Sequence, residues 1–200
     1  MPKLRTADDL ADFRDRLCDA AETMFAEHGP DAVTIRQLAA AVGVSPMTPY
    51  RYFEGKDAIL AAVRARAFDR HAEALEKAFE AAPDDPDIRS AAVGRAYVRF
   101  ALEHPEAYKL MFDTKQASFD EHPDLVRASE RSRATMTLHL KGVAIAGDAE
   151  AVGLLYWSAL HGPLMLHFAG LLPPGVSVVS MIGSLVDAVA AATSASADAR

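Results

Sequence analysis

Hydrogen-bond donors gather in one short stretch of the chain, residues 34–56. Hydroxyl and guanidinium groups there, such as those of Thr48, Tyr50 and Arg51, suit the phosphate oxygens and base edges of nucleic acids. The stretch holds three basic residues and one acidic residue, whereas the whole chain has a formal net charge of -7. This balance argues against a nonspecific polyanion binder and indicates a small, local DNA-binding surface.

The first half of this stretch is typical of a helix. Apolar side chains recur at positions i, i+3, i+4 and i+7 from Ile35 to Val42, which puts them on one helical face. Thr34 and Gln37 have the spacing of a capping box, in which each side chain bonds a backbone N–H of the other residue. Gly43 then suits the positive φ that ends a helix. The sequence therefore predicts a short, well-capped helix.

A second short helix is expected after the glycine. Ser45 can cap its start, Pro46 suits its first position, and the helix is expected to end near Phe53. Two short helices joined by a tight turn form a helix-turn-helix, whose second helix reads the major groove of DNA. Pro49 lacks the N–H that would close the first helical hydrogen bond, so we expect this helix to start irregularly.

Each polar residue of this face also has a simpler interpretation. Arg51 could be a solvated surface charge, and Tyr50 and Tyr52 could pack against a neighbouring helix. Capping boxes also occur in helices that have no nucleic-acid role. DNA binding is favoured because the cap, the turn glycine, the second cap and the aromatic and basic face all fall within residues 34–56.

Residues 14–63 resemble the DNA-binding domain of TetR-family transcriptional regulators, most clearly over residues 44–53. The resemblance implies that Thr34 and Arg36 hold phosphates or reach a base edge and that Lys56 holds a phosphate. It also implies that residues 45–48 enter the major groove and that the two tyrosines touch the DNA backbone. Pro49 departs from the leucine common in the family, so the resemblance does not fix individual base contacts. The expected DNA-binding residues are Thr34, Arg36, Ser45, Pro46, Met47, Thr48, Tyr50, Arg51, Tyr52 and Lys56.

Length and composition favour a globular, all-α protein. The chain has 200 residues, half of them hydrophobic, and we find no strand pattern or internal repeat. No apolar run reaches the length of a membrane span, and the N-terminus lacks a secretory signal, so we expect a cytoplasmic protein. The single cysteine, Cys18, excludes an intrachain disulfide and is expected to lie in the core, with a redox-sensing role as the less favoured alternative.

The predicted fold is a three-helix helix-turn-helix DNA-binding domain followed by a larger helical bundle for ligand binding and dimerisation. We predict the first domain over residues 9–56 and the second over residues 57–193, with flexible tails at 1–8 and 194–200. A long helix is expected from Lys56 to the Pro-Asp-Asp-Pro turn at 83–86. The other expected helices lie at about 9–28, 87–103, 105–112, 124–145, 148–170 and 175–193.

Two segments of the second domain, residues 104–112 and 157–162, resemble the TetR subgroup named for its Trp, His and Gly (WHG). Trp157 and His161 are four residues apart, so they share a helical face. A ligand cavity with an apolar lining and a few polar groups is one interpretation, and a filled bundle core is the other. His161 could equally be a structural histidine bonded to a carbonyl. The candidate ligand-binding residues are Tyr97, Phe100, Tyr108, Met111, Phe112, Met136, His139, Trp157 and His161.

The last two helices have very few charges, so they must be covered almost all round, either by the bundle or by a second subunit. The TetR resemblance implies a homodimer through these helices. The favoured function is a ligand-responsive repressor that binds a pseudo-palindromic, double-stranded DNA operator and is released by a small apolar effector. A DNA-binding protein without a ligand is the main alternative.

An enzyme is the least favoured alternative, because no common catalytic, zinc or phosphate-binding motif is present. His161 and His167 are six residues apart, so they do not converge on one metal. We therefore expect no catalytic residues, no metal and no cofactor.

Overall fold

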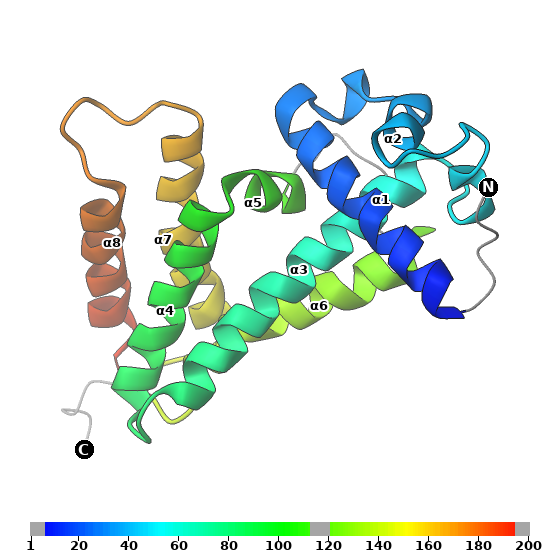
Figure 1. Ribbon diagram of the computed structural model, residues 1–200. Coiled ribbons are helices and arrows are strands. Elements are labelled where there is room, and N and C mark those ends of the chain that lie inside the picture. Colours follow the sequence, from blue (N-terminus) through cyan, green and yellow to red (C-terminus); the bar gives the residue numbers. More distant parts are fainter. Residues whose placement is uncertain (1–6, 113–120, 195–200) are drawn as a thin grey trace, which may run out of the picture. The chain divides into compact units, whose positions relative to one another are not determined.

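The computed structural model describes residues 7–112 and 121–194, and the regular structure within these ranges is helical (Figure 1). This confirms the all-α prediction. The helices are α1 (Ala7–His28), η1 (Pro30–Ala32), α2 (Ile35–Ala41), η2 (Pro49–Arg51), α3 (Lys56–Ala81), α4 (Pro86–Glu103), α5 (Pro105–Met111), α6 (Pro123–Leu138), α7 (Ala149–Phe168) and α8 (Val178–Thr193).

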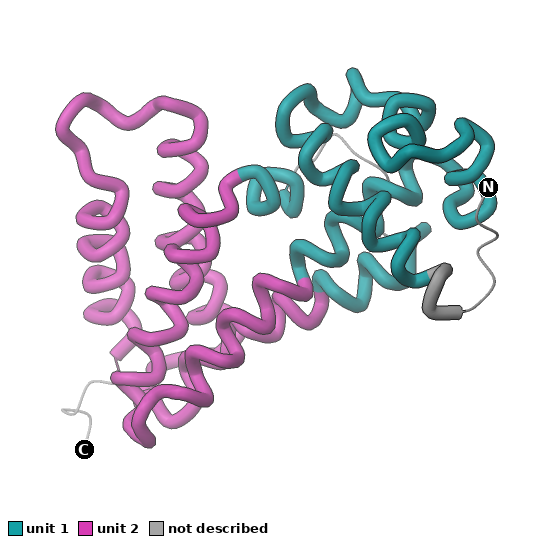
Figure 2. Tube along the Cα trace, viewed as in Figure 1, with its two compact units in different colours: residues 1–68, 106–129 teal, residues 69–105, 130–200 magenta. Residues whose placement is uncertain are grey.

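The chain folds into two compact units that interleave along the sequence (Figure 2). The first unit comprises residues 1–68 and 106–129, and the second comprises residues 69–105 and 130–200. Helices α3 and α6 each contribute residues to both units. The compact units therefore do not coincide with the predicted domains, 9–56 and 57–193. The assignment of DNA binding to the first domain and of ligand binding to the second stays a prediction.

The predicted tails lie mostly outside the described residues. Where they are described, they belong to the fold. Ala7 and Asp8 are part of α1, and the backbone of Ser194 pairs with that of Ile145. The helix expected over 124–145 ends earlier, at Leu138, because the chain turns there and Gly142 takes a φ of 81°.

The core of the first unit is built around α1. Phe13, Leu17 and Phe25 recur at helical spacing on its inner face and are almost fully buried. Leu38 of α2 and Val63 of α3 join the same cluster. This packing of α1 against α2 and the first half of α3 positions the turn that follows α2.

Cys18 lies in this core, 3% exposed and without a disulfide. Burial raises the pKa of its thiol. A buried thiol with a raised pKa supplies little thiolate, so these properties favour the core interpretation over redox sensing.

The second unit packs α4 and α8 against α7. At Gly153 of α7 the backbone of α6 comes so close that an added Cβ would lie 2.8 Å from the carbonyl oxygen of Met136. Glycine is therefore required there by the close approach of the two helices. Asp148 caps the start of α7, accepting from the backbone N–H of Ala151 at 2.9 Å.

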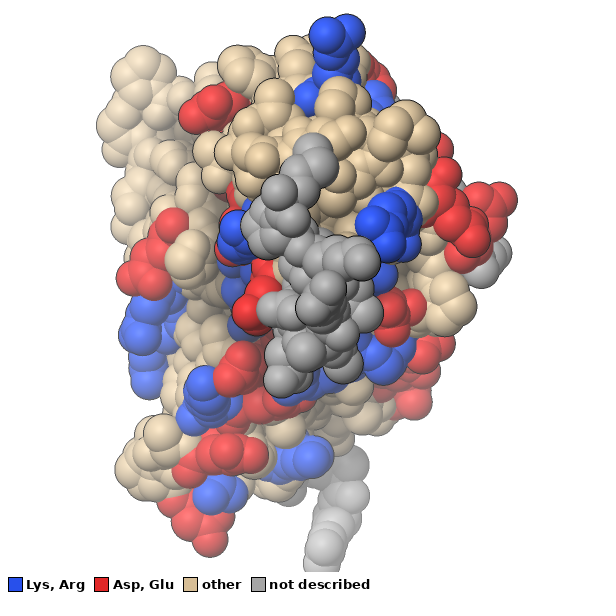
Figure 3. Space-filling model, turned by 45° about the vertical axis from the view of Figure 1, so that its right-hand side comes forward, with Lys and Arg blue, Asp and Glu red and all other residues tan. Residues whose placement is uncertain are grey.

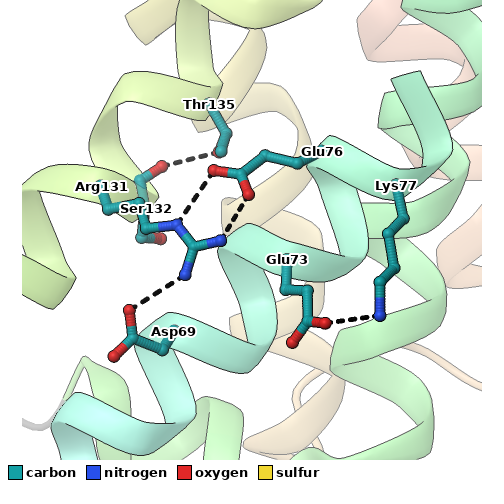
Figure 4. A network of polar contacts seen from close by, with 7 residues as sticks. All are labelled: Asp69, Glu73, Glu76, Lys77, Arg131, Ser132 and Thr135. Atoms are coloured by element: carbon teal, nitrogen blue, oxygen red, sulfur yellow. Dashed lines mark hydrogen bonds and ion pairs between the residues drawn. The ribbon is translucent and has the colours of Figure 1, made fainter. Parts of the chain in front are cut away.

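An arginine of α6 holds two acidic residues of α3 within the second unit (Figure 4). Arg131 donates from Nε to Glu76 at 3.1 Å and from Nη1 to Asp69 at 3.2 Å, and its Nη2 reaches the other oxygen of Glu76. Hydrogen bonding to Glu76 raises the pKa of Arg131, so the guanidinium stays charged. These contacts therefore fix the position of α6 along α3.

None of the helices that the structure describes is both long and apolar enough to cross a bilayer.

Candidate DNA-binding surface and ligand cavity

Helix α2 begins at a capping box, as the sequence predicts. The Thr34 hydroxyl accepts from the backbone N–H of Gln37 at 3.3 Å, and the Thr34 backbone N–H donates to Oε1 of Gln37 at 2.8 Å. The Thr34 hydroxyl also donates to that oxygen at 2.7 Å. Both orphan N–H groups are thus satisfied before any ligand arrives, and the start of α2 is fixed.

The turn after α2 also follows the prediction. Gly43 has a φ of 71°, the left-handed conformation that glycine adopts without a steric penalty. The backbone N–H of Val44 then donates to Ala39 at 2.9 Å. These contacts end α2 and turn the chain sharply into the next segment.

The second helix of the motif is much shorter than expected. Residues 46–48 form turns, and only Pro49–Arg51 is helical, with 3-10 geometry. Thr48 donates to the carbonyl of Ser45 at 2.8 Å, an i to i-3 bond. An α-helical continuation would need an N–H at position 49 to bond Ser45, and Pro49 has none. The predicted irregular start therefore extends through most of the segment.

The side chains of this segment divide into exposed and packed groups. Met47 is 69% and Tyr50 is 52% exposed, and Arg36, Pro46 and Arg51 are exposed as well. Within the described ranges, neither Arg36 nor Arg51 has an ion-pair partner. Cations and large side chains that are free in this way can reach phosphates and base edges.

Four of the predicted DNA-binding residues are less free. Ser45 and Thr48 are half-buried, and the Ser45 hydroxyl accepts from the backbone of Met47 at 3.4 Å. The ring of Tyr52 lies 4.6 Å from that of Phe13, so much of it belongs to the core. Lys56 donates to the carbonyl of Pro30 at 2.9 Å, which ties the start of α3 to the turn before α2.

Basic and acidic side chains are interspersed on the face in Figure 3, and outside its grey atoms there is no broad field of one sign. This agrees with a net charge of -7 and with a small number of phosphate contacts per chain.

The second unit contains a cavity of about 1170 Å³, lined by residues of α3, α4, α6, α7 and α8 and of the loop after α6. Ligand sites typically measure about 300–1,000 Å³, so this cavity can hold an extended small molecule. Four of the predicted ligand-binding residues lie in its wall: Tyr97, Met136, His139 and Trp157.

A polar chain forms the aromatic part of this wall. The indole N–H of Trp157 donates to the hydroxyl of Tyr97 at 3.0 Å, and that hydroxyl lies 3.4 Å from Nδ1 of His161. Tryptophan can only donate, so the tyrosine accepts from it, and the tautomer of His161 sets which group donates in the second contact. Burial lowers the pKa of His161 and so favours its neutral ring. His161 itself stacks on Trp157 from outside the cavity lining.

His139 lines the cavity but keeps one ring nitrogen buried. The residue is 9% exposed, and its Nε2 has no hydrogen-bond partner among the described residues. Burial lowers its pKa to about 4, so the ring is neutral at physiological pH. A buried polar atom without a partner costs stability.

The remaining predicted ligand-binding residues lie elsewhere. Phe100 is buried beside His71, with ring centroids 5.2 Å apart. Tyr108 and Met111 of α5 are fully buried in the first unit, and Phe112 contacts Phe68 there. Helical spacing alone could not separate these core residues from cavity residues.

The cavity wall also includes residues that the sequence analysis missed. Gly94 and Gly183 line it from α4 and α8, and Arg95, Arg99 and Asp187 lie there too. The glycines on α4 and α8 could have suggested a cleft, but only if the sequence showed that these two helices line one cavity.

A helix-turn-helix with exposed donors, joined to a helical unit that holds a cavity, defines the class of DNA-binding transcription regulators. Two family models match the chain: "Bacterial regulatory proteins, tetR family" over residues 17–63 and "Tetracyclin repressor-like, C-terminal domain" over residues 90–189. The chain belongs to the TetR family and is a transcription regulator rather than an enzyme.

Relatives agree with this assignment. The chain is 30% identical to the HTH-type transcriptional regulator BetI of Rhizobium meliloti over 142 residues, which cover 70% of each protein. Among solved structures, a protein of unknown function from Rhodococcus sp. RHA1 is 30% identical, has a TM-score of 0.78 and aligns over 91% of this chain and 95% of its own. The TetR regulator PfmR of Thermus thermophilus shares the fold, with a TM-score of 0.66 at 23% identity over 88% of this chain and 97% of its own.

Proposed function

We propose that this regulator is a ligand-responsive repressor, a homodimer that binds a pseudo-palindromic operator in the cytoplasm and leaves it when a small apolar effector binds. The observation that supports it best is the exposed α2–η2 surface, where Arg36, Met47, Tyr50 and Arg51 face outward. In a symmetric dimer, two such surfaces meet successive major grooves about 34–36 Å apart.

The residues of this surface take different roles. Arg36 and Arg51 are the primary phosphate or guanine contacts, since each is an exposed guanidinium. Met47 and Tyr50 reach into or along the groove, and the caps at Thr34 and Ser45 hold the backbone that presents them. Lys56 acts mainly as a structural clamp through Pro30, and Tyr52 mainly as a core residue.

A homodimer through α7 and α8 is supported by an exposed apolar stripe. Helix α7 is apolar on nearly all sides, yet Leu154 is 45%, Leu155 is 50% and Leu166 is 39% exposed. A helix of this kind is normally buried all round, so a second surface is expected to cover it. Small residues beside these leucines, such as Ser158 and Gly162, would allow close packing of a second copy.

The cavity of the second unit is the proposed effector site. An effector that binds better to a conformation with the wrong spacing of the two recognition surfaces lowers operator affinity by population shift. Helix α3 is a suitable carrier of this change, because it contributes to both units.

The DNA-binding assignment is tested with the double substitution Arg36→Ala and Arg51→Ala. Operator DNA is first obtained by selecting genomic fragments bound by the purified chain. Loss of two phosphate contacts per subunit should weaken binding and reduce the magnitude of the salt slope by about 2 per subunit. Lys77→Ala removes one cation of an exposed ion pair on α3 and should leave both quantities nearly unchanged. Unchanged binding by the double variant would refute the assignment of this surface.

A further inference from the structure

The wall that α4 presents to the cavity has an apolar inner edge and a basic outer edge. Tyr97 and Val93 are buried, whereas Arg95 and Arg99 are exposed, and all four line the cavity. At 100° per residue, Arg95 and Arg99 lie on nearly the same side of α4 and on the opposite side from Tyr97. A molecule lying on this wall therefore meets aromatic rings inward and guanidinium groups outward.

The two guanidinium groups have no fixed partner. Within residues 7–112 and 121–194, neither Arg95 nor Arg99 takes part in an ion pair. Two cations one helical turn apart repel each other when nothing lies between them. The chain as a whole carries a net charge of -7, so two neighbouring arginines without acidic partners differ from the rest of the surface. A bound anion would neutralise them.

Acidic residues also lie in the cavity wall, and they limit the positive charge. Asp87 is two helical turns before Arg95 on α4, about 12 Å along the axis. Asp187 is exposed on α8, the opposite wall. Glu103, exposed at the last position of α4, follows Arg99 by one helical turn, so acidic residues lie on both sides of the arginine pair along the helix.

The deeper wall supplies the other half of the recognition chemistry. Tyr97, Trp157 and Met136 provide an aromatic and apolar surface beside His139. The wall of α4 from Pro86 to Arg99 extends for about 20 Å, which suits an elongated molecule.

We propose that the effector is an amphipathic anion, whose acidic head lies at Arg95 and Arg99 and whose apolar body lies along Tyr97 and Trp157. This inference rests on the proposed effector role of the cavity. It adds a chemical class, an apolar chain or ring system that ends in a carboxylate or another acid.

Trp157 makes the inference directly measurable. It is the single tryptophan of the chain and lies in the cavity wall, so its fluorescence reports occupancy. The probes are dodecanoate, dodecan-1-ol and dodecylamine, each titrated below its micellar concentration, because they share a chain and differ in the charge of the head. Dodecanoate should bind about tenfold more tightly than the alcohol, equivalent to about 1.4 kcal/mol, and the amine should bind most weakly.

Substitutions assign the preference to the proposed residues. Arg95→Gln with Arg99→Gln should reduce the advantage of dodecanoate over the alcohol to about twofold or less, and Asp187→Asn should increase it. Arg133→Gln is the matched control, because Arg133 is an exposed α6 arginine outside the cavity wall. It should leave the preference unchanged, which separates local contacts from net charge.

The outcomes separate this inference from the proposed function. Equal binding of acid and alcohol, or preference for the amine, would refute the anion while leaving an effector site in place. Binding of none of the three probes would also refute it. Operator binding by the parent protein is measured separately. If the protein binds no operator, the proposed repressor function is wrong, whereas the proposed ligand class is tested only by the probes.

Discussion

Two buried histidines of the second unit, His71 and His139, are each short of one hydrogen bond. His71 pairs through Nδ1 with the Ser132 hydroxyl at 2.9 Å, but its Nε2 has no partner among the described residues. Burial lowers the pKa of each ring to about 4. Both side chains are therefore neutral in the folded protein at pH 7.

These histidines predict a protein that loses stability in mild acid. In the unfolded chain they bind a proton near pH 6.5, whereas in the folded chain they bind it only near pH 4. The unfolded state thus takes up more protons between these values, and the free energy of unfolding decreases as the pH falls. Each histidine contributes up to about 1.4 kcal/mol per pH unit.

Urea unfolding at a series of pH values from 7.5 to 5 tests this prediction. His139→Leu, which removes one of the two groups, should make the decrease in stability with falling pH less steep. A pH dependence that is the same in the variant and the parent protein would contradict the role of His139.

At the scale of elements, the close contact between α6 and α7 at Gly153 gives a sharp prediction. Gly153→Ala adds a Cβ that would lie 2.8 Å from a backbone oxygen, so the helices must separate. We expect a loss of about 1–3 kcal/mol in the free energy of unfolding.

The matched control is Gly94→Ala on α4, where an added Cβ meets no atom within 4 Å. This variant should gain up to about 1 kcal/mol from helix propensity. Denaturant unfolding of both variants measures the difference. If both variants change the free energy of unfolding by the same amount, the backbone of α6 at Met136 moves aside without a loss of stability.

The elements themselves could largely be predicted from the sequence, because their signals are local. The capping box at Thr34, the turn at Gly43 and the start of α3 at Lys56 each depend on residues a few positions apart. The shortening of the second motif helix was only partly predictable. Pro49 showed where one hydrogen bond is missing, but not that the neighbouring turns would replace the helix.

The cavity could not be predicted in the same way, since it depends on which helices face each other. Tyr97 and Tyr108 have the same residue type on neighbouring helices, yet one lines the cavity and the other fills the core of the first unit. Lys56 illustrates the same limit at the DNA-binding surface. Its bond to Pro30 spans 26 residues and leaves no trace in local spacing.

At the scale of the whole molecule, the α7 stripe predicts the oligomeric state. Leu154→Lys with Leu155→Lys places two charges on the proposed interface and should convert the proposed dimer to a monomer in sedimentation equilibrium. Operator affinity should fall with it, because each monomer binds a single half-site.

Ile88→Lys is the control for this experiment, since Ile88 is a 45% exposed apolar residue on α4. It should remain dimeric and bind the operator normally. A double leucine variant that stays dimeric would place the interface on another surface.

The short η2 segment has a consequence for how such a regulator can diversify. Its conformation is held by Gly43, by backbone hydrogen bonds and by Pro49, which is buried. Met47 and Tyr50 contribute little to that framework because they are mostly exposed. In the DNA-binding role proposed above for these two side chains, substitutions there would change operator preference at little cost to folding, so gene duplicates would acquire new target sites one mutation at a time without compensating changes in the core.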